Sequence, residues 1–230
     1  MADIPTPDDD PWPAAGGAGG PLTVDGRPVP PSPDTGFLSV PEASAAVQHI
    51  YDEDVDEVGY VMNQTRLWAH QPALQQGLFA LIGDAVTAAG LTFRQRAVLI
   101  TAAASARDDA YCSLAWGARL AEVSSPDTAA GVVRGDDVGL DEGERALAAW
   151  ARAVVRDPNG VAAADVEALR GAGLDDARIV AVTTLVALRL AFATVNDALG
   201  ARPDHALHDA VPVEVRAAVT FGRPPAAGEG

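Results

Sequence analysis

Apolar positions follow a helical spacing along most of the chain, and no useful length of it alternates with the period of two that a β-strand requires. Sequences typical of β-hairpin turns are missing as well. The pattern therefore predicts an all-α fold, with helices over residues 41–51, 72–90, 91–104, 110–120, 142–155, 161–170 and 175–200.

Helix boundaries can be placed from the residues that begin and end helices. Pro41 and Pro72 suit the first turn of a helix, and Thr92 suits an N-cap. Residues 105–109 should end one helix and cap the next, and Gly200 should end the last. The helix that starts at Pro72 should bury an apolar stripe made of Leu74, Leu78, Leu81 and Ile82.

The two ends of the chain differ in composition from the middle. Residues 1–36 are rich in Pro, Gly and Asp and have few large apolar side chains, so a disordered acidic arm is expected there. Residues 222–230 repeat this composition and should fray. The helical domain is then expected over residues 37–221. Twelve acidic residues and one arginine lie within residues 1–60, so most of the net charge of −16 belongs to this end.

Charge and hydropathy argue against two classes of partner. All 16 basic residues are arginine, and a net charge of −16 does not suit nucleic acid, whose phosphates bind clustered Lys and Arg. The longest uncharged apolar run of the C-terminal half, residues 179–188, is far shorter than the ~20 residues that cross a bilayer. The N-terminus lacks the basic and apolar regions of a secretory signal. We expect a soluble, cytoplasmic protein with no membrane partner.

The chain has one cysteine, Cys112, which excludes an internal disulfide and a zinc site built on several thiolates. If residues 105–109 cap a helix, the helix dipole lowers the thiol pKa, whereas Asp108 and Asp109 raise it by a similar amount. Because the two effects oppose each other, the sequence does not predict an activated Cys112 thiol. Cys112 is either a nucleophile that a peroxide oxidises to a sulfenic acid, or a small hydrophobe packed against Trp116.

Other candidate residues surround this cysteine. Asp109 is either a general acid or base or a helix N-cap. Ser105, Tyr111 and Trp116 are candidates for a substrate pocket, with helix packing as the alternative for the aromatic pair. His205 and His208 have metal-ligand spacing, but no further ligands complete a site. We therefore expect neither a metal nor a cofactor.

Residues 105–117 resemble the C-x-Y-C-x-x-x-H signature of the carboxymuconolactone decarboxylase and alkylhydroperoxidase D superfamily. Tyr111 and Cys112 match it, Asp109 stands in place of the first cysteine, and Trp116 stands in place of the histidine. The likeness to the peroxidase-related branch of this superfamily covers roughly residues 40–205. Further segments that carry it are residues 59–72, 91–96 and 163–179.

The resemblance implies an alkylhydroperoxidase D-like helical bundle that forms a homo-oligomer, as a dimer, trimer or hexamer. It also places Ala97 where the family has a relay glutamate, so the internal disulfide and the proton relay are both lost. Three functions remain: a one-cysteine peroxidase or thiol oxidoreductase that uses Cys112 and an external thiol reductant, a lyase or decarboxylase that acts on a small organic acid through Asp109, and a non-catalytic oligomer that binds a small molecule.

Overall fold

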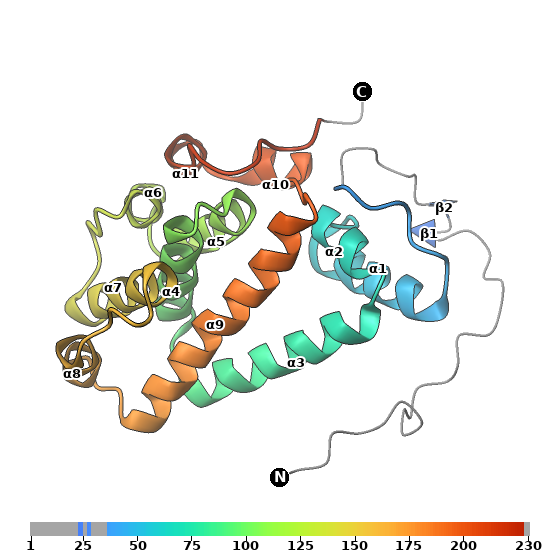
Figure 1. Ribbon diagram of the computed structural model, residues 1–230. Helices are drawn as coiled ribbons and strands as arrows, with labels where there is room; N and C mark the ends of the chain where they lie inside the picture. The colour runs from blue at the N-terminus through green and yellow to red at the C-terminus, as the bar shows by residue number, and fades with distance from the viewer. Residues whose placement is uncertain (1–22, 25–26, 29–35, 228–230) are drawn as a thin grey trace, which may run out of the picture.

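The computed structural model describes residues 23–24, 27–28 and 36–227, and within them the fold is built from helices (Figure 1). The predicted all-α class is confirmed. The one exception is a two-residue antiparallel pair near the N-terminus, β1 (Thr23–Val24) and β2 (Arg27–Pro28). The helices are α1 (Ala45–Val58), α2 (Asn63–Trp68), α3 (Pro72–Ala89), α4 (Phe93–Ala106), α5 (Ala110–Val123), α6 (Pro126–Arg134), α7 (Glu142–Arg156), α8 (Ala163–Gly171), α9 (Asp176–Ala198), α10 (His205–Ala210) and α11 (Val213–Ala218).

The two longest helices, α3 and α9, run along each other across the molecule (Figure 1). The shorter helix α4 lies among α5, α6, α7 and α9 and contacts all four. Helices α1 and α2 lie on the other side of α9 from α7 and α8, and α11 packs on α5 and α6 (Figure 1). Among the described residues, α9 alone is long and apolar enough to cross a membrane by length and composition, and it packs against α3, α4 and α7.

Helix α4 is the centre of the core because its side chains are small enough to let neighbouring helices approach. Residues 97–104 are buried without interruption, and four of these eight are alanine. The predicted N-cap is correct, since the Thr92 hydroxyl accepts a hydrogen bond from the Gln95 amide and Oε1 of Gln95 accepts one from the Thr92 amide. Such a capping box fixes where α4 begins and thereby sets the register of the core.

Arginine side chains tie the ends of the helices together. Arg94 at the start of α4 donates two hydrogen bonds to Glu144 in the first turn of α7, at 2.5 and 3.0 Å. Arg178 on α9 donates to the last carbonyls of α3, at Ala89 and Gly90. Arg178 thus satisfies carbonyls that a helix end leaves without partners, and Arg94 makes a charge-assisted pair, so each pair of helices is held in a fixed position.

The predicted burial of the α3 stripe is wrong at two of its four positions. Ile82 is buried and Leu78 is partly buried, but Leu74 and Leu81 are 63% and 49% exposed. The reason is that α3 turns a different face to the core, made of Gln75, Ile82, Ala85 and Ala89. Part of the apolar stripe of α3 is therefore left on the surface.

A few described residues of the two terminal segments contact the helical domain. Thr23, within the expected disordered arm, exchanges two hydrogen bonds with the Gln48 side chain on α1. Residues 222–227, expected to fray, lie against the domain, where Arg202 donates to the carbonyls of Pro224 and Pro225. The remainder of both predicted segments lies outside the described residues.

A close approach at Gly117 gives a test of this packing. A methyl group added there would lie 2.7 Å from Cγ1 of Val215, a fully buried side chain of α11. We predict that Gly117→Ala destabilises the protein by about 1–3 kcal/mol, because the packed α5–α11 contact must open. Gly83 on α3 has open space around it, so Gly83→Ala should stabilise by about 0.5–1 kcal/mol. Urea unfolding of both variants measures the difference, and equal stabilities would contradict the packing.

Candidate functional site

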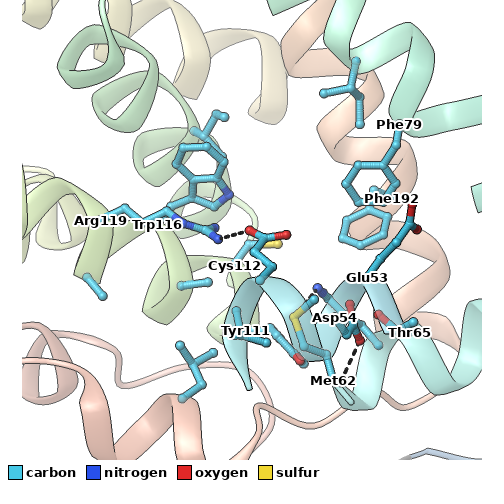
Figure 2. A pocket seen from close by; sticks show the side chains of 18 of the residues that line it. Glu53, Asp54, Met62, Thr65, Phe79, Tyr111, Cys112, Trp116, Arg119 and Phe192 are labelled. Carbon is cyan, nitrogen blue, oxygen red and sulfur yellow. Dashed lines mark hydrogen bonds and ion pairs between the residues drawn. The ribbon is translucent and has the colours of Figure 1, made fainter. Parts of the chain in front are cut away.

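A cavity of about 1270 Å³ lies between α1, α3, α4, α5, α9 and α10. Figure 2 shows Trp116 and Arg119 of α5 on one wall, Phe79 and Phe192 on the opposite wall, and Asp54 with its neighbours below. Cys112 lies between the two walls. The cavity brings together three of the predicted site residues, namely Tyr111, Cys112 and Trp116.

Ring contacts hold the aromatic wall in place. Phe192 of α9 stacks on Trp68 of α2, with centroids 5.6 Å apart and planes 12° from parallel. Phe79 of α3 meets the same Phe192 edge-on at 5.2 Å. Trp68 is fixed in turn because its indole N–H donates to Asn196 at 2.8 Å. The result is a rigid apolar surface drawn from three helices.

Three arginines surround the opposite aromatic residue, Trp116. The guanidinium carbons of Arg96, Arg119 and Arg189 lie 5.7, 5.1 and 5.5 Å from its ring centroid. Attraction between cation and ring accounts for part of this arrangement. Only Arg119 has a carboxylate partner among the described residues, Glu57 at 3.1 Å. The cavity therefore combines a flat ring with positive charge that its own walls do not neutralise.

The thiol of Cys112 is buried, with 4% of the residue exposed, yet it lies on the cavity wall. Burial raises its pKa far above the ordinary thiol value, and the negative charge of Asp109 raises it further. Arg189 acts in the opposite direction, with Nη2 3.5 Å from Sγ, but does not compensate. Loss of hydration thus outweighs both the helix dipole and the local charges considered from the sequence. The thiol is protonated at neutral pH.

Asp109 is the N-cap of α5, one of the two roles expected for it. Its Oδ1 accepts a hydrogen bond from the Cys112 amide at 2.9 Å, and the residue is 2% exposed. Asp108 before it adopts a left-handed conformation (φ 61°), which turns the chain sharply from α4 into α5. Asp109 lines a separate space of about 10 Å³, with room for one water molecule at most, and does not line the large cavity.

Ser105 does not belong to the pocket that was predicted for it. Its hydroxyl donates to the Ala102 carbonyl within α4 at 3.2 Å, and it lines neither of the two spaces described. A serine in the last turn of a helix commonly bonds its own backbone in this way. The expected relay position, Ala97, is likewise fully buried in the core.

Tyr111 contributes its ring to the cavity and its hydroxyl to a buried polar cluster. The hydroxyl donates to Oδ2 of Asp204, whose Oδ1 accepts from the Asn63 amide at 2.8 Å. Burial raises the pKa of the Asp204 carboxyl, and these hydrogen bonds partly offset the effect. The cluster joins α5 to the segments before α2 and α10, so Tyr111 positions helices as well as lining the cavity.

A second buried carboxyl, Asp54 of α1, lies on the cavity floor (Figure 2). Burial raises its pKa to about 7, although Oδ2 accepts a hydrogen bond from the Met62 amide at 2.8 Å. At neutral pH a large fraction of Asp54 is therefore uncharged. This matters for the cavity because one of its acidic residues then carries only part of a full negative charge.

Sequence reasoning missed Asp54, Phe79, Arg96, Arg189 and Phe192. One signal was present: Arg189 interrupts a long apolar pattern inside a helix, where a charge has to face something polar. The others come from helices whose faces could be assigned only once their packing was known. No cluster of three or more His, Cys, Asp or Glu side chains that could hold a metal occurs among the described residues, and His205 and His208 both lie beside Asp209.

No protein-family model matches the chain, and no functionally curated protein matches it in sequence. Several solved structures, however, match the chain in fold. One is an uncharacterized peroxidase-related protein with an alkylhydroperoxidase AhpD core from Ralstonia eutropha JMP134, with a TM-score of 0.66 and 25% identity over 75% of this chain and 94% of that one. Another is an uncharacterized peroxidase-related protein from Silicibacter sp. TM1040, with a TM-score of 0.68 and 20% identity over 78% and 97%. A third is the debrominase Bmp8 in complex with 2,3,4-tribromopyrrole, with a TM-score of 0.60 and 13% identity over 72% and 89%.

The raised pKa of Asp54 predicts how stability depends on pH. The carboxyl titrates near 3.8 when unfolded and at about 7 when folded, so the folded state binds the proton more tightly. Its contribution is present in full below about pH 3.8 and is lost as the pH rises through about 7. The loss is at most ~4 kcal/mol, from about three pKa units.

We therefore predict that Asp54→Asn flattens the stability profile over this pH range and makes the protein more stable than the wild type above pH 7. Urea unfolding at a series of pH values measures the slope. Asp56 is exposed on the same helix, and Asp56→Asn should keep the wild-type slope. Identical slopes for Asp54→Asn and the wild type would show that this carboxyl is not the group responsible.

Proposed function

Since the chain belongs to the alkylhydroperoxidase D-like superfamily, we propose that it binds a small organic molecule in the cavity beside Cys112. The solved structures bear out the resemblance at the level of the superfamily. The observation that carries the proposal is the cavity itself. Its volume of about 1270 Å³ is ample for a drug-sized molecule, and its walls combine aromatic rings with a few polar groups, as ligand sites do.

The character of the walls favours a ligand with a flat or apolar body. Trp116 faces the edge-to-face pair Phe79 and Phe192 across the cavity, so a flat apolar body would find aromatic rings on two of the cavity walls. Bmp8, a protein of the same fold, has been crystallised with 2,3,4-tribromopyrrole, a small flat ring. That precedent supports the class of ligand and does not extend to debromination by this chain.

A second candidate function is thiol chemistry at Cys112. The thiolate would attack a peroxide oxygen and break the O–O bond to give a sulfenic acid and an alcohol or water. An external thiol would then reduce it. The contact between Arg189 and Sγ favours this candidate, while burial of the thiol opposes it. We rank it second for that reason. An acid or base role for Asp109 has no geometric support, because its carboxylate caps α5 and does not line the cavity.

We further propose that the chain is a soluble cytoplasmic homo-oligomer. The exposed part of the α3 stripe supports association of several copies, since Leu74 and Leu81 of α3 and Val180 of α9 are exposed apolar side chains on two helices that run together.

We predict that Leu81→Glu lowers the molar mass measured by light scattering after size exclusion. Val138→Glu, at an exposed apolar position outside α3 and α9, should leave it unchanged. A wild-type protein with the mass of one chain would contradict the proposal.

Filling the cavity tests the binding function. Ala115 lines the cavity from α5, so Ala115→Phe places a ring in the space the ligand needs. We predict that naphthalene-1-carboxamide, a neutral flat probe, binds the wild type and binds this variant about tenfold more weakly or worse. Calorimetric titration measures both dissociation constants. Ala149→Phe, on the exposed face of α7, serves as the control for an added ring.

The alkylation rate of Cys112 distinguishes the proposed binding function from the proposed thiol chemistry. Because burial raises the thiol pKa, we predict alkylation by iodoacetamide near neutral pH at a rate roughly 100-fold or more below that of a free thiol, and a normal rate in denaturant. Asp109→Asn retains an N-cap residue and removes a negative charge, so it should speed alkylation. Fast labelling of the folded wild type, with a sulfenic acid after hydrogen peroxide, would favour the peroxidase.

A further inference from the structure

We propose that the ligand of this cavity is an organic anion whose carboxylate or phosphate is bound by Arg96 and Arg189 beside Trp116. The inference rests on the proposed function and adds the chemical class of the ligand. The two arginines come from different helices, α4 and α9, that converge on the ring of one residue of α5. Sequence reasoning assigned no role to either.

Neither arginine has a partner suited to its charge. Of the described residues, no carboxylate lies within ion-pair distance of Arg96 or Arg189, and the buried Nε of each has no hydrogen-bond acceptor. Their other contacts are to aromatic rings and, for Arg189, to Sγ of Cys112. A guanidinium offers five donors in a plane, so several N–H groups of both side chains remain available.

The charges around the cavity also favour an anionic ligand. Burial lowers the pKa of Arg96, and the nearby charge of Arg119 lowers it further. The second of these effects is repulsion between positive charges. A carboxylate or phosphate bound at Arg96 would relieve that repulsion and would match the planar donors of a guanidinium.

The acidic residues of the cavity do not neutralise these two arginines. Glu57 is bound to Arg119, and Asp54, with its pKa raised to about 7, is only partly ionised at neutral pH. The remaining carboxylates that line the cavity, Glu53, Asp56 and Glu122, are exposed. Solvent screens exposed charges, whereas the half-buried guanidiniums are screened less. The inner part of the cavity is therefore basic, although the chain as a whole is acidic.

The position of Arg189 also indicates that the anion has an apolar body. Arg189 lies over both Trp116 and Phe192, at 5.5 and 5.2 Å, so its charge is at the border of the apolar wall. A bare inorganic anion would leave that wall in contact with water. An anion with an apolar or aromatic body would satisfy the charge and cover the rings at once. We therefore commit to an amphipathic organic anion.

A pair of probes of matched shape tests the charge preference. Naphthalene-1-carboxylate and naphthalene-1-carboxamide are titrated calorimetrically into the full chain near neutral pH. We expect the carboxylate to bind about tenfold or more tightly than the amide. Arg96→Gln and Arg189→Gln should each weaken carboxylate binding about tenfold and change amide binding little. Arg134→Gln, at an exposed arginine of α6 paired with Asp136, should change neither.

Charge-preserving variants distinguish loss of the positive charge from loss of the fold. Arg96→Lys and Arg189→Lys keep the positive charge and should retain part of the preference for the carboxylate, while circular dichroism checks that each variant is folded. Equal binding of both probes by the wild type, or a preference that survives both glutamine substitutions, would overturn the inference and leave the cavity function standing. Binding of neither probe would overturn both.

Discussion

The burial of residues 97–104, the middle of helix α4, is the constraint on which the rest of the structure depends. These residues are almost without solvent contact because α5, α6, α7 and α9 pack around them. A helix in that position tolerates only small or well-fitted apolar side chains. It fixes where α5 and α9 lie, and so it fixes two walls of the cavity. The Thr92 cap and the Arg94–Glu144 pair hold the same helix at its beginning.

The cavity remains open for an electrostatic reason. Apolar walls such as those of Phe79, Phe192 and Trp116 would gain free energy by closing on one another. Closure would remove Arg96 and Arg189 from water with no carboxylate among the described residues to pair with, and this desolvation opposes the gain from apolar contact. The arginines therefore oppose closure and also supply the charge that the proposed anion would contact. Burial of the Cys112 thiol itself keeps it protonated, which separates this site from a reactive-cysteine site.

The sequence predicts the helices well where local chemistry decides them. The starts of α3, α4 and α5 follow from Pro72, Thr92 and residues 105–109. Helices α2, α6, α10 and α11 were not predicted. Helix α6 begins at Ser125 with proline next, a start signal that was present but unused, whereas α2 has no capping side chain to reveal it.

The candidate site was predictable only in part, because burial and distance decide it. Tyr111, Cys112 and Trp116 were identified, since they share one helix and one motif. Arg96 and Arg189 lie 93 residues apart in sequence, and only the packing of α4 against α9 brings them to the same ring. Whether the fold raises or lowers the Cys112 pKa could not be predicted from nearby charges alone, because the dominant effect is loss of hydration. Ser105 was misplaced because its hydroxyl bonds to its own helix.

The most direct test of the account asks where a bound molecule lies. The chain has four tryptophans, which can be labelled with 5-fluorotryptophan and assigned by substitution to phenylalanine. We expect titration with a flat aromatic probe to shift the ¹⁹F resonance of Trp116 at the cavity and leave that of Trp150, in the α7 core, unchanged. A shift of Trp150 without one at Trp116, or saturation of binding with no change at Trp116, would contradict the account.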